Sequence, residues 1–123
     1  MLITIDNVLN GDELAAARDL LAASRWGSGL DTAGTQAAQV KNNQQVPEGS
    51  EQLPALRRLV LQALNRAPLF FTAALPLKIL PPFFNRYSGA TNAYGFHADN
   101  AMRMVPGQPG SYVRSDVSAT LFL

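Results

Sequence analysis

Apolar residues recur at helical spacing near the start of the chain. Leu14, Ala17 and Leu21 repeat at intervals of three and four, which places them on one face of a helix. The turn Asn10-Gly11-Asp12 comes just before, and its two polar side chains are both suited to capping the first N–H groups. The pattern therefore predicts a helix from this turn to about Ser24.

A second helix is predicted from Ser50 to about Arg66. Pro54 falls in its first turn, where the missing N–H costs little because that group has no helical partner. A third, shorter helix is expected over 69–75, where Pro76 stops it. The apolar face of the second helix is formed by residues three or four apart, namely Leu53, Leu56, Val60 and Leu64.

Strand-like sequences are concentrated in the later part of the chain. The range 26–49 is rich in Gly, Asn and Gln, so we expect loops there, with one short strand around Ala38–Val40. Helices first and strands later is typical of an α+β fold, and 123 residues suit a single domain, 1–123. Branched, aromatic or alternating segments predict strands at Leu2–Ile5, Leu77–Leu80, Phe83–Tyr87, Ala93–Asp99 and Ser115–Leu123.

Composition narrows the class of protein. With 47% hydrophobic and 15% charged residues, the chain is not an extended disordered protein. A formal net charge of +1 argues against a nucleic-acid binder that depends on phosphate neutralisation. The chain has no basic leader sequence and no run of ~18 apolar residues, so we expect a soluble, cytoplasmic protein without membrane contact. The absence of cysteine excludes a disulfide framework, a thiolate metal site and a cysteine nucleophile.

His97 and Asp99 are the residues with the clearest chemical potential. Residues i and i+2 of a strand point to the same face, with Cα atoms ~6.6 Å apart. An imidazole and a carboxylate at those positions can bind one cation such as Fe(II), Mn(II) or Zn(II). Gly95 shares that face, and its lack of a side chain would leave room for a ligand.

Alone, the His-x-Asp spacing is a weak signal, because it is common by chance. No Gly-x-Ser-x-Gly elbow and no phosphate-binding Gly-rich loop accompany it. Tyr87 and Tyr94 could contact a cofactor or simply pack with a bonded hydroxyl. Arg103 and Arg114 lie near the motif, and a structural ion pair with Asp116 or Asp99 is the expected role of Arg114.

Several segments in order along nearly the whole chain resemble the bacterial PKHD-type hydroxylases. These proteins belong to the Fe(II)- and 2-oxoglutarate-dependent dioxygenases related to prolyl and lysyl hydroxylases. The resemblance is carried by Trp26, Thr32–Gly34, Val40–Asn43, Phe84–Gly89, Tyr94–Ala101 and Arg114–Leu123.

The resemblance implies a double-stranded β-helix, or jelly roll, with N-terminal helices packed on it. It implies a helical support region at about 1–75 and the first strands of the jelly roll at about 76–123. It also implies that His97 and Asp99 are iron ligands, that Tyr87 binds the cosubstrate 2-oxoglutarate, and that an unidentified substrate is hydroxylated.

The chain departs from the family pattern because His97 is its only histidine. The family needs a second histidine ligand and an arginine for 2-oxoglutarate, both further downstream, so we expect an incomplete jelly roll that is inactive alone. The alternative is a non-catalytic helix-plus-sheet module completed by a partner chain, and its apolar strand edge makes a homodimer plausible. A small Zn(II) protein has the least support, because further ligands are missing.

Overall fold

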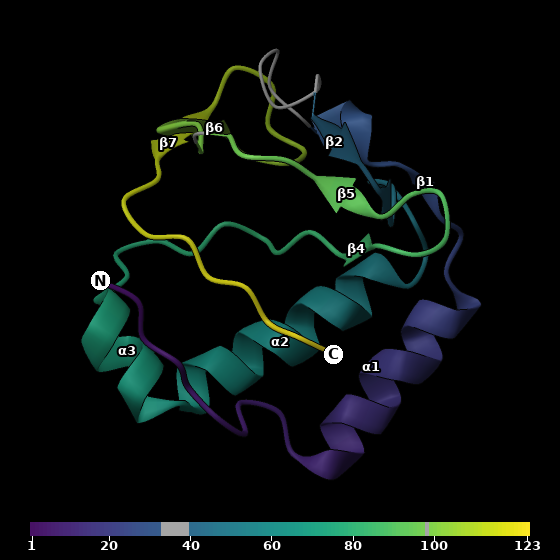
Figure 1. The fold of residues 1–123 in the computed structure, drawn as a ribbon. Coiled ribbons are helices and arrows are strands. Elements are labelled where there is room, and N and C mark those ends of the chain that lie inside the picture. The colour runs from purple at the N-terminus through teal and green to yellow at the C-terminus, as the bar shows by residue number, and fades with distance from the viewer. Residues whose placement is uncertain (33–39, 98) are drawn as a thin grey trace. The chain divides into compact units, whose positions relative to one another are not determined.

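The structure is a computed structural model that describes residues 1–32, 40–97 and 99–123 (Figure 1). Its described residues form two compact units, each built from segments far apart in the sequence. The helical unit consists of Met1–Ser24, Glu51–Pro82 and Val117–Leu123. The sheet unit consists of Arg25–Ser50 and Phe83–Asp116. No described helix is long and apolar enough to cross a membrane.

The first helix of the helical unit, α1, spans Gly11–Ala23 and begins with a capping box. The Asn10 side chain accepts a hydrogen bond from the Glu13 N–H at 2.8 Å, and the Glu13 carboxylate accepts one from the Asn10 N–H at 2.9 Å. Both carboxylates of the first turn, Asp12 and Glu13, suit the positive end of the helix dipole. The sequence-based prediction of this helix and its cap is confirmed.

The helix α2 spans Leu53–Arg66 and packs against both α1 and α3, which spans Pro68–Ala74. The carbonyl of Leu64 ends α2 by accepting a hydrogen bond from the Ala67 N–H at 3.1 Å. The predicted helices are therefore confirmed, with one shift on the buried face, where Ala63 takes the place expected for Leu64. The buried apolar side chains of this unit are Ala17, Leu53, Leu56, Val60 and Ala63.

The sheet unit holds short antiparallel strands. A three-stranded sheet has the order β1-β3-β4, and two-stranded sheets join β2 to β5 and β6 to β7. Val46 and Phe84 are its buried apolar residues, and the Val46 N–H donates to the Phe84 carbonyl at 3.0 Å. The strands are β1 (Gly27–Ser28), β2 (Lys41–Asn42), β3 (Gln44–Gln45), β4 (Asn85–Arg86), β5 (Ala93–Tyr94), β6 (Met102–Met104) and β7 (Tyr112–Arg114), with a 3₁₀ turn at Gly29–Thr32.

Together the units make an α+β fold, as predicted. The jelly roll stays a prediction, since the described strands form only small sheets. The expectation of loops over 26–49 is wrong, because β1, β2 and β3 lie there. Of the strand expected around 38–40, residues 38 and 39 lie outside the described residues, and Val40 is in a turn.

Three predicted strands are absent from the described structure. Leu2–Ile5, Leu77–Leu80 and Ser115–Leu123 carry no strand assignment. Their composition favours extended backbone, but a strand also needs a neighbouring backbone to complete its ladder. In Ser115–Leu123, for example, the N–H of Ser115 reaches the carbonyl of Ala101 at 2.7 Å, but no ladder continues from it among the described residues.

Candidate functional site

Strand β5 leads directly into the candidate site. It pairs with β2 so that Tyr94 lies opposite Lys41, and the Gly95 N–H then donates to the Val40 carbonyl at 3.0 Å. The strand expected over 93–99 stops after Tyr94, so His97 and Asp99 follow the strand rather than lie within it. Pairing with β2 therefore fixes the segment just upstream of both residues.

The structure brings the two sequence-predicted ligands together. His97 Nε2 lies 3.5 Å from Asp99 Oδ1. Two donors that each lie ~2.1 Å from one cation are ~3.0 Å apart at a right angle and ~3.4 Å apart at a tetrahedral angle. The observed separation is therefore close to that of two ligands of one ion. It is also longer than a normal N–H···O hydrogen bond.

The backbone of Gly95 orients the imidazole. His97 Nδ1 lies 2.7 Å from the Gly95 carbonyl oxygen. Because a carbonyl oxygen only accepts, we assign the hydrogen to Nδ1. In the neutral ring Nε2 then has a free lone pair, and this is the nitrogen that faces Asp99. A ligating histidine is held in this way when its other nitrogen bonds a carbonyl or carboxylate.

An aromatic ring covers one face of the imidazole. The rings of Tyr94 and His97 are stacked with centroids 3.7 Å apart and an interplanar angle of 10°. Lys41 Nζ lies 5.5 Å from the centroid of the Tyr94 ring. The His97 side chain is 22% exposed and the Asp99 side chain 62% exposed, so the pair is sheltered on one side and open to solvent on the other.

The charged and phenolic groups around the pair influence one another. Burial raises the pKa of Tyr94, and the nearby Asp99 carboxylate adds to that rise while Arg103 opposes it. Burial also raises the pKa of Tyr87, with a smaller contribution from Tyr94. Burial and the positive charge of Arg103 lower the pKa of Lys41. Tyr87, the residue predicted to bind 2-oxoglutarate, is therefore close enough to Tyr94 for the charge of Tyr94 to affect the pKa of Tyr87.

The space beside Gly95 differs from the expectation. A methyl group at Gly95 would lie 3.1 Å from Val40 Cβ, so the missing side chain makes room for Val40 rather than for a ligand. The contribution of the Gly95 carbonyl was not predicted, because no sequence pattern distinguishes a backbone acceptor. The contact of Lys41 with the Tyr94 ring was also not predicted, since only the pairing of β2 with β5 brings the two residues together.

Other predicted residues stand apart from the pair. Arg114 forms the expected ion pair with Asp116, at 2.7 Å. Among the described residues, no group of three or more His, Cys, Asp or Glu side chains could hold a metal ion. Within the part of the chain that the structure describes, His97 and Asp99 therefore supply two donors and no third of these types.

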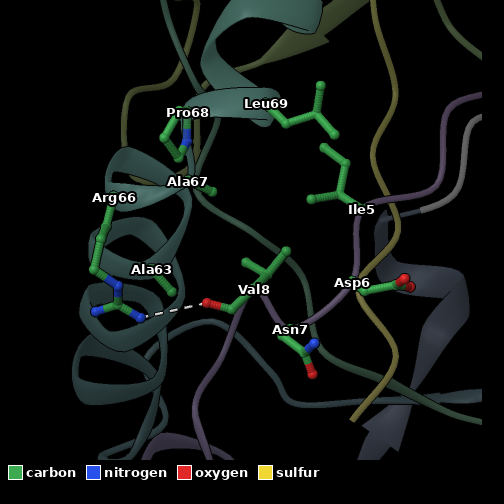
Figure 2. Close-up of a pocket in the computed structure, with 9 residues that line it drawn as sticks. All are labelled: Ile5, Asp6, Asn7, Val8, Ala63, Arg66, Ala67, Pro68 and Leu69. Atoms are coloured by element: carbon green, nitrogen blue, oxygen red, sulfur yellow. Dashed lines mark hydrogen bonds between the residues drawn. The ribbon is translucent and has the colours of Figure 1, made fainter.

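A cavity of about 330 Å³ lies in the helical unit and contains none of the candidate residues (Figure 2). Arg66 at its wall donates to the Val8 carbonyl at 3.3 Å and is paired with Glu13 at 2.6 Å. The positive charge of Arg66, the cation among the lining residues, is therefore already paired. The other lining residues are Ile5, Asp6, Asn7, Ala63, Ala67, Pro68 and Leu69.

Curated proteins match the chain from end to end. A protein named PKHD-type hydroxylase from Nitrosomonas eutropha is 73% identical over 123 residues, which make up 100% of this chain and 54% of the relative. Proteins of the same name from Nitrosomonas europaea and Azoarcus sp. are 72% and 68% identical over the same 123 residues. No family model matches the chain.

The similarity covers every segment described above, including the one that carries His97 and Asp99. The chain spans about half the length of the curated relatives it matches and aligns with their N-terminal part. Over that part, the chain is a homologue of proteins named PKHD-type hydroxylases, at 68–73% identity to these three.

Proposed function

We propose that this chain supplies two iron ligands of an Fe(II)- and 2-oxoglutarate-dependent hydroxylase, namely His97 through Nε2 and Asp99 through a carboxylate oxygen. The observation that carries the proposal is the 3.5 Å separation of these two atoms, with Nδ1 turned away toward Gly95. The hydroxylase name of the relatives supports the hydroxylase part of this proposal.

The donor set fits part of the proposed centre. Two histidines and one carboxylate are the usual protein ligands of non-haem iron oxygenases. His97 and Asp99 match one histidine and the carboxylate of that set. With 2-oxoglutarate and O₂, such a centre would couple oxidative decarboxylation of the cosubstrate to succinate and CO₂ with hydroxylation of a C–H bond, one oxygen atom of O₂ entering succinate and the other the hydroxyl group. The third ligand is proposed to come from outside the described residues.

The chain's own residues would prepare the site. The Gly95 carbonyl holds the proton on Nδ1, which keeps Nε2 available as a donor. The Asp99 carboxylate contributes negative charge that offsets the charge of a cation. We assign to Tyr87 a hydrogen bond from its hydroxyl to 2-oxoglutarate. Burial raises the pKa of Tyr87, which favours the protonated, donating form.

We further propose that the strands of the sheet unit belong to the first part of a jelly roll. The identity of the hydroxylated substrate and a cytoplasmic location stay predictions. The alternative of a non-catalytic module predicts the same fold without metal binding, so a binding experiment separates the two functions.

The test is an anaerobic Fe(II) titration with and without 2-oxoglutarate, on a chain extended beyond Leu123 to the length of the relatives. We expect a charge-transfer absorption band that needs both components and that His97→Ala and Asp99→Ala abolish. Asp116→Asn is the matched control, because its carboxylate pairs with Arg114 instead. Absence of the band in the extended wild-type chain would contradict the proposal and favour the non-catalytic module.

A further inference from the structure

The ring stack at His97 points to a role for Tyr94 that its sequence position does not reveal. We propose that Tyr94 is a positioning residue: its ring fixes the plane of the His97 imidazole so that Nε2 faces Asp99. The orienting role stands on the geometry of this chain alone. Its consequence, tighter binding of a divalent cation by His97 and Asp99, rests on the proposed function.

The contact between the two rings is extensive. Their centroids are 3.7 Å apart and their planes are within 10° of parallel, so the imidazole lies flat on the phenol ring. Such a stack restricts rotation about the bond that joins the imidazole to its Cβ, because turning the ring would lift one edge off Tyr94. The stack therefore sets the ring plane.

A second contact sets which edge of the ring faces Asp99. With the plane fixed, the imidazole can still flip by half a turn, which exchanges Nδ1 with Cδ2 and Nε2 with Cε1. The hydrogen bond from Nδ1 to the Gly95 carbonyl at 2.7 Å favours one of the two orientations. Stacking and hydrogen bonding together leave Nε2 3.5 Å from Asp99 Oδ1.

Tyr94 is itself well anchored, as a positioning residue must be. It is the last residue of β5 and lies directly opposite Lys41 of β2. The next residue continues the pairing through the Gly95 N–H and the Val40 carbonyl at 3.0 Å. On the side-chain level, Lys41 Nζ lies 5.5 Å from the ring centroid, within the range of a cation–π contact.

The first experiment observes His97 directly by NMR without metal. His97 is the only histidine, so its imidazole gives one set of signals. In the wild type we expect cross-relaxation between the His97 and Tyr94 ring protons, upfield ring-current shifts, and the tautomer that carries its hydrogen on Nδ1. Absence of the cross-relaxation in the wild type would overturn the proposal whatever the variants do.

Variants then separate the ring from the hydroxyl. Tyr94→Phe keeps the aromatic face and should retain both the shifts and the Nδ1-protonated form. Tyr94→Leu removes the aromatic ring. The His97 signals should then move toward those of a free histidine, in which Nε2 carries more of the hydrogen. Tyr112→Leu, at a 57% exposed position on β7, is the matched control and should change neither. Retention of the wild-type signals in Tyr94→Leu would overturn the proposal.

The second experiment measures the affinity for Mn(II) from the broadening of the His97 signals. Tyr94→Leu should weaken binding by about 2- to 12-fold, the range corresponding to the stacking of one aromatic pair, while Tyr94→Phe should bind like the wild type. Equal affinities of all three proteins would overturn the link to metal binding. If Mn(II) leaves His97 of the wild type unchanged, the proposed metal site fails, and the metal-free signals alone decide the orienting role.

Discussion

At the scale of single residues, the candidate site depends on one backbone carbonyl. The Gly95 carbonyl accepts from His97 Nδ1 while the Gly95 Cα packs against Val40. The packing of residue 95 against Val40 and the orientation of the His97 imidazole therefore depend on the same residue. A side chain at Gly95 would disturb both, because its first carbon would press on Val40.

Gly95→Ala is expected to destabilise the protein and to shift the His97 imidazole signals, because the new methyl group would lie 3.1 Å from Val40 Cβ. Overpacking of this kind costs about 1–3 kcal/mol. Urea unfolding and NMR of His97 measure the two effects. Val40→Gly in the same chain removes that Cβ and should relieve the clash, and failure of the second change to restore the signals would contradict the explanation.

A tighter glycine contact occurs in the sheet unit, at Gly29. A methyl group there would collide with Asn43 Oδ1, and Asn43 is buried with its Nδ2 bonded to Asn85 Oδ1 at 2.8 Å. We expect Gly29→Ala to lower the free energy of unfolding by at least 1 kcal/mol, roughly the cost of overpacking. Gly11→Ala, which meets nothing within 4 Å, is the control. Equal urea midpoints for the two variants would contradict this prediction.

At the scale of elements, the start of α1 is tied to the end of α2. Glu13 accepts from the Asn10 N–H in the capping box and from both terminal nitrogens of Arg66, at 2.7 and 2.6 Å. The same carboxylate therefore closes one helix and binds another. Since the ion pair is exposed to solvent, its strength should depend on both pH and salt.

Stability near pH 4 tests this link. The hydrogen bonds from Arg66, and secondarily that from the Asn10 N–H, lower the pKa of Glu13 in the folded protein. A lowered pKa means that the stabilisation is complete above the unfolded value of about 4.3 and is lost as the pH falls through the folded value. The difference in urea midpoint between wild type and Glu13→Gln should thus shrink on acidification. A difference that stays constant from pH 7 to pH 3 would contradict the role of the ionised form.

The buried face of α2 is the second test at this scale. Leu56 is fully buried, with 0% of its surface exposed, whereas Leu69 of α3 is 51% exposed. Leu56→Ala should cost about 2–5 kcal/mol because it leaves a cavity, and Leu69→Ala should cost much less. Urea unfolding of both variants measures the difference, and similar losses would show that α2 does not form the core of the helical unit.

The elements also show what the sequence could reveal. The helices follow from local spacing and caps. The one difference on the buried face of α2 is that Ala63, rather than Leu64, is buried. Strands of two or three residues have no comparable local signal, since they exist through distant partners, as β2 does through β5. Leu2–Ile5 shows the reverse case, a strand-like sequence without strand assignment. The spacing of His97 and Asp99 was readable from sequence, but the stack on Tyr94 was not.

At the scale of the whole molecule, identity to the relatives extends over all 123 residues while covering about half of each relative. Two protein donors provide little chelation compared with the three expected of the complete centre. The 123-residue chain should therefore bind Fe(II) more weakly than the extended chain and produce no succinate from 2-oxoglutarate. Clear succinate formation by the 123-residue chain would contradict this expectation.

In the proposed site, His97 and Asp99 bind the same divalent cation. The decisive measurement is a titration of Mn(II) into the 123-residue chain, observed through the imidazole signals of its single histidine. We expect Mn(II) to broaden these signals selectively, Asp99→Asn to require much more Mn(II) for the same effect, and Asp116→Asn to behave like the wild type. Signals that ignore Mn(II), or that broaden equally well in Asp99→Asn, would contradict the proposed site.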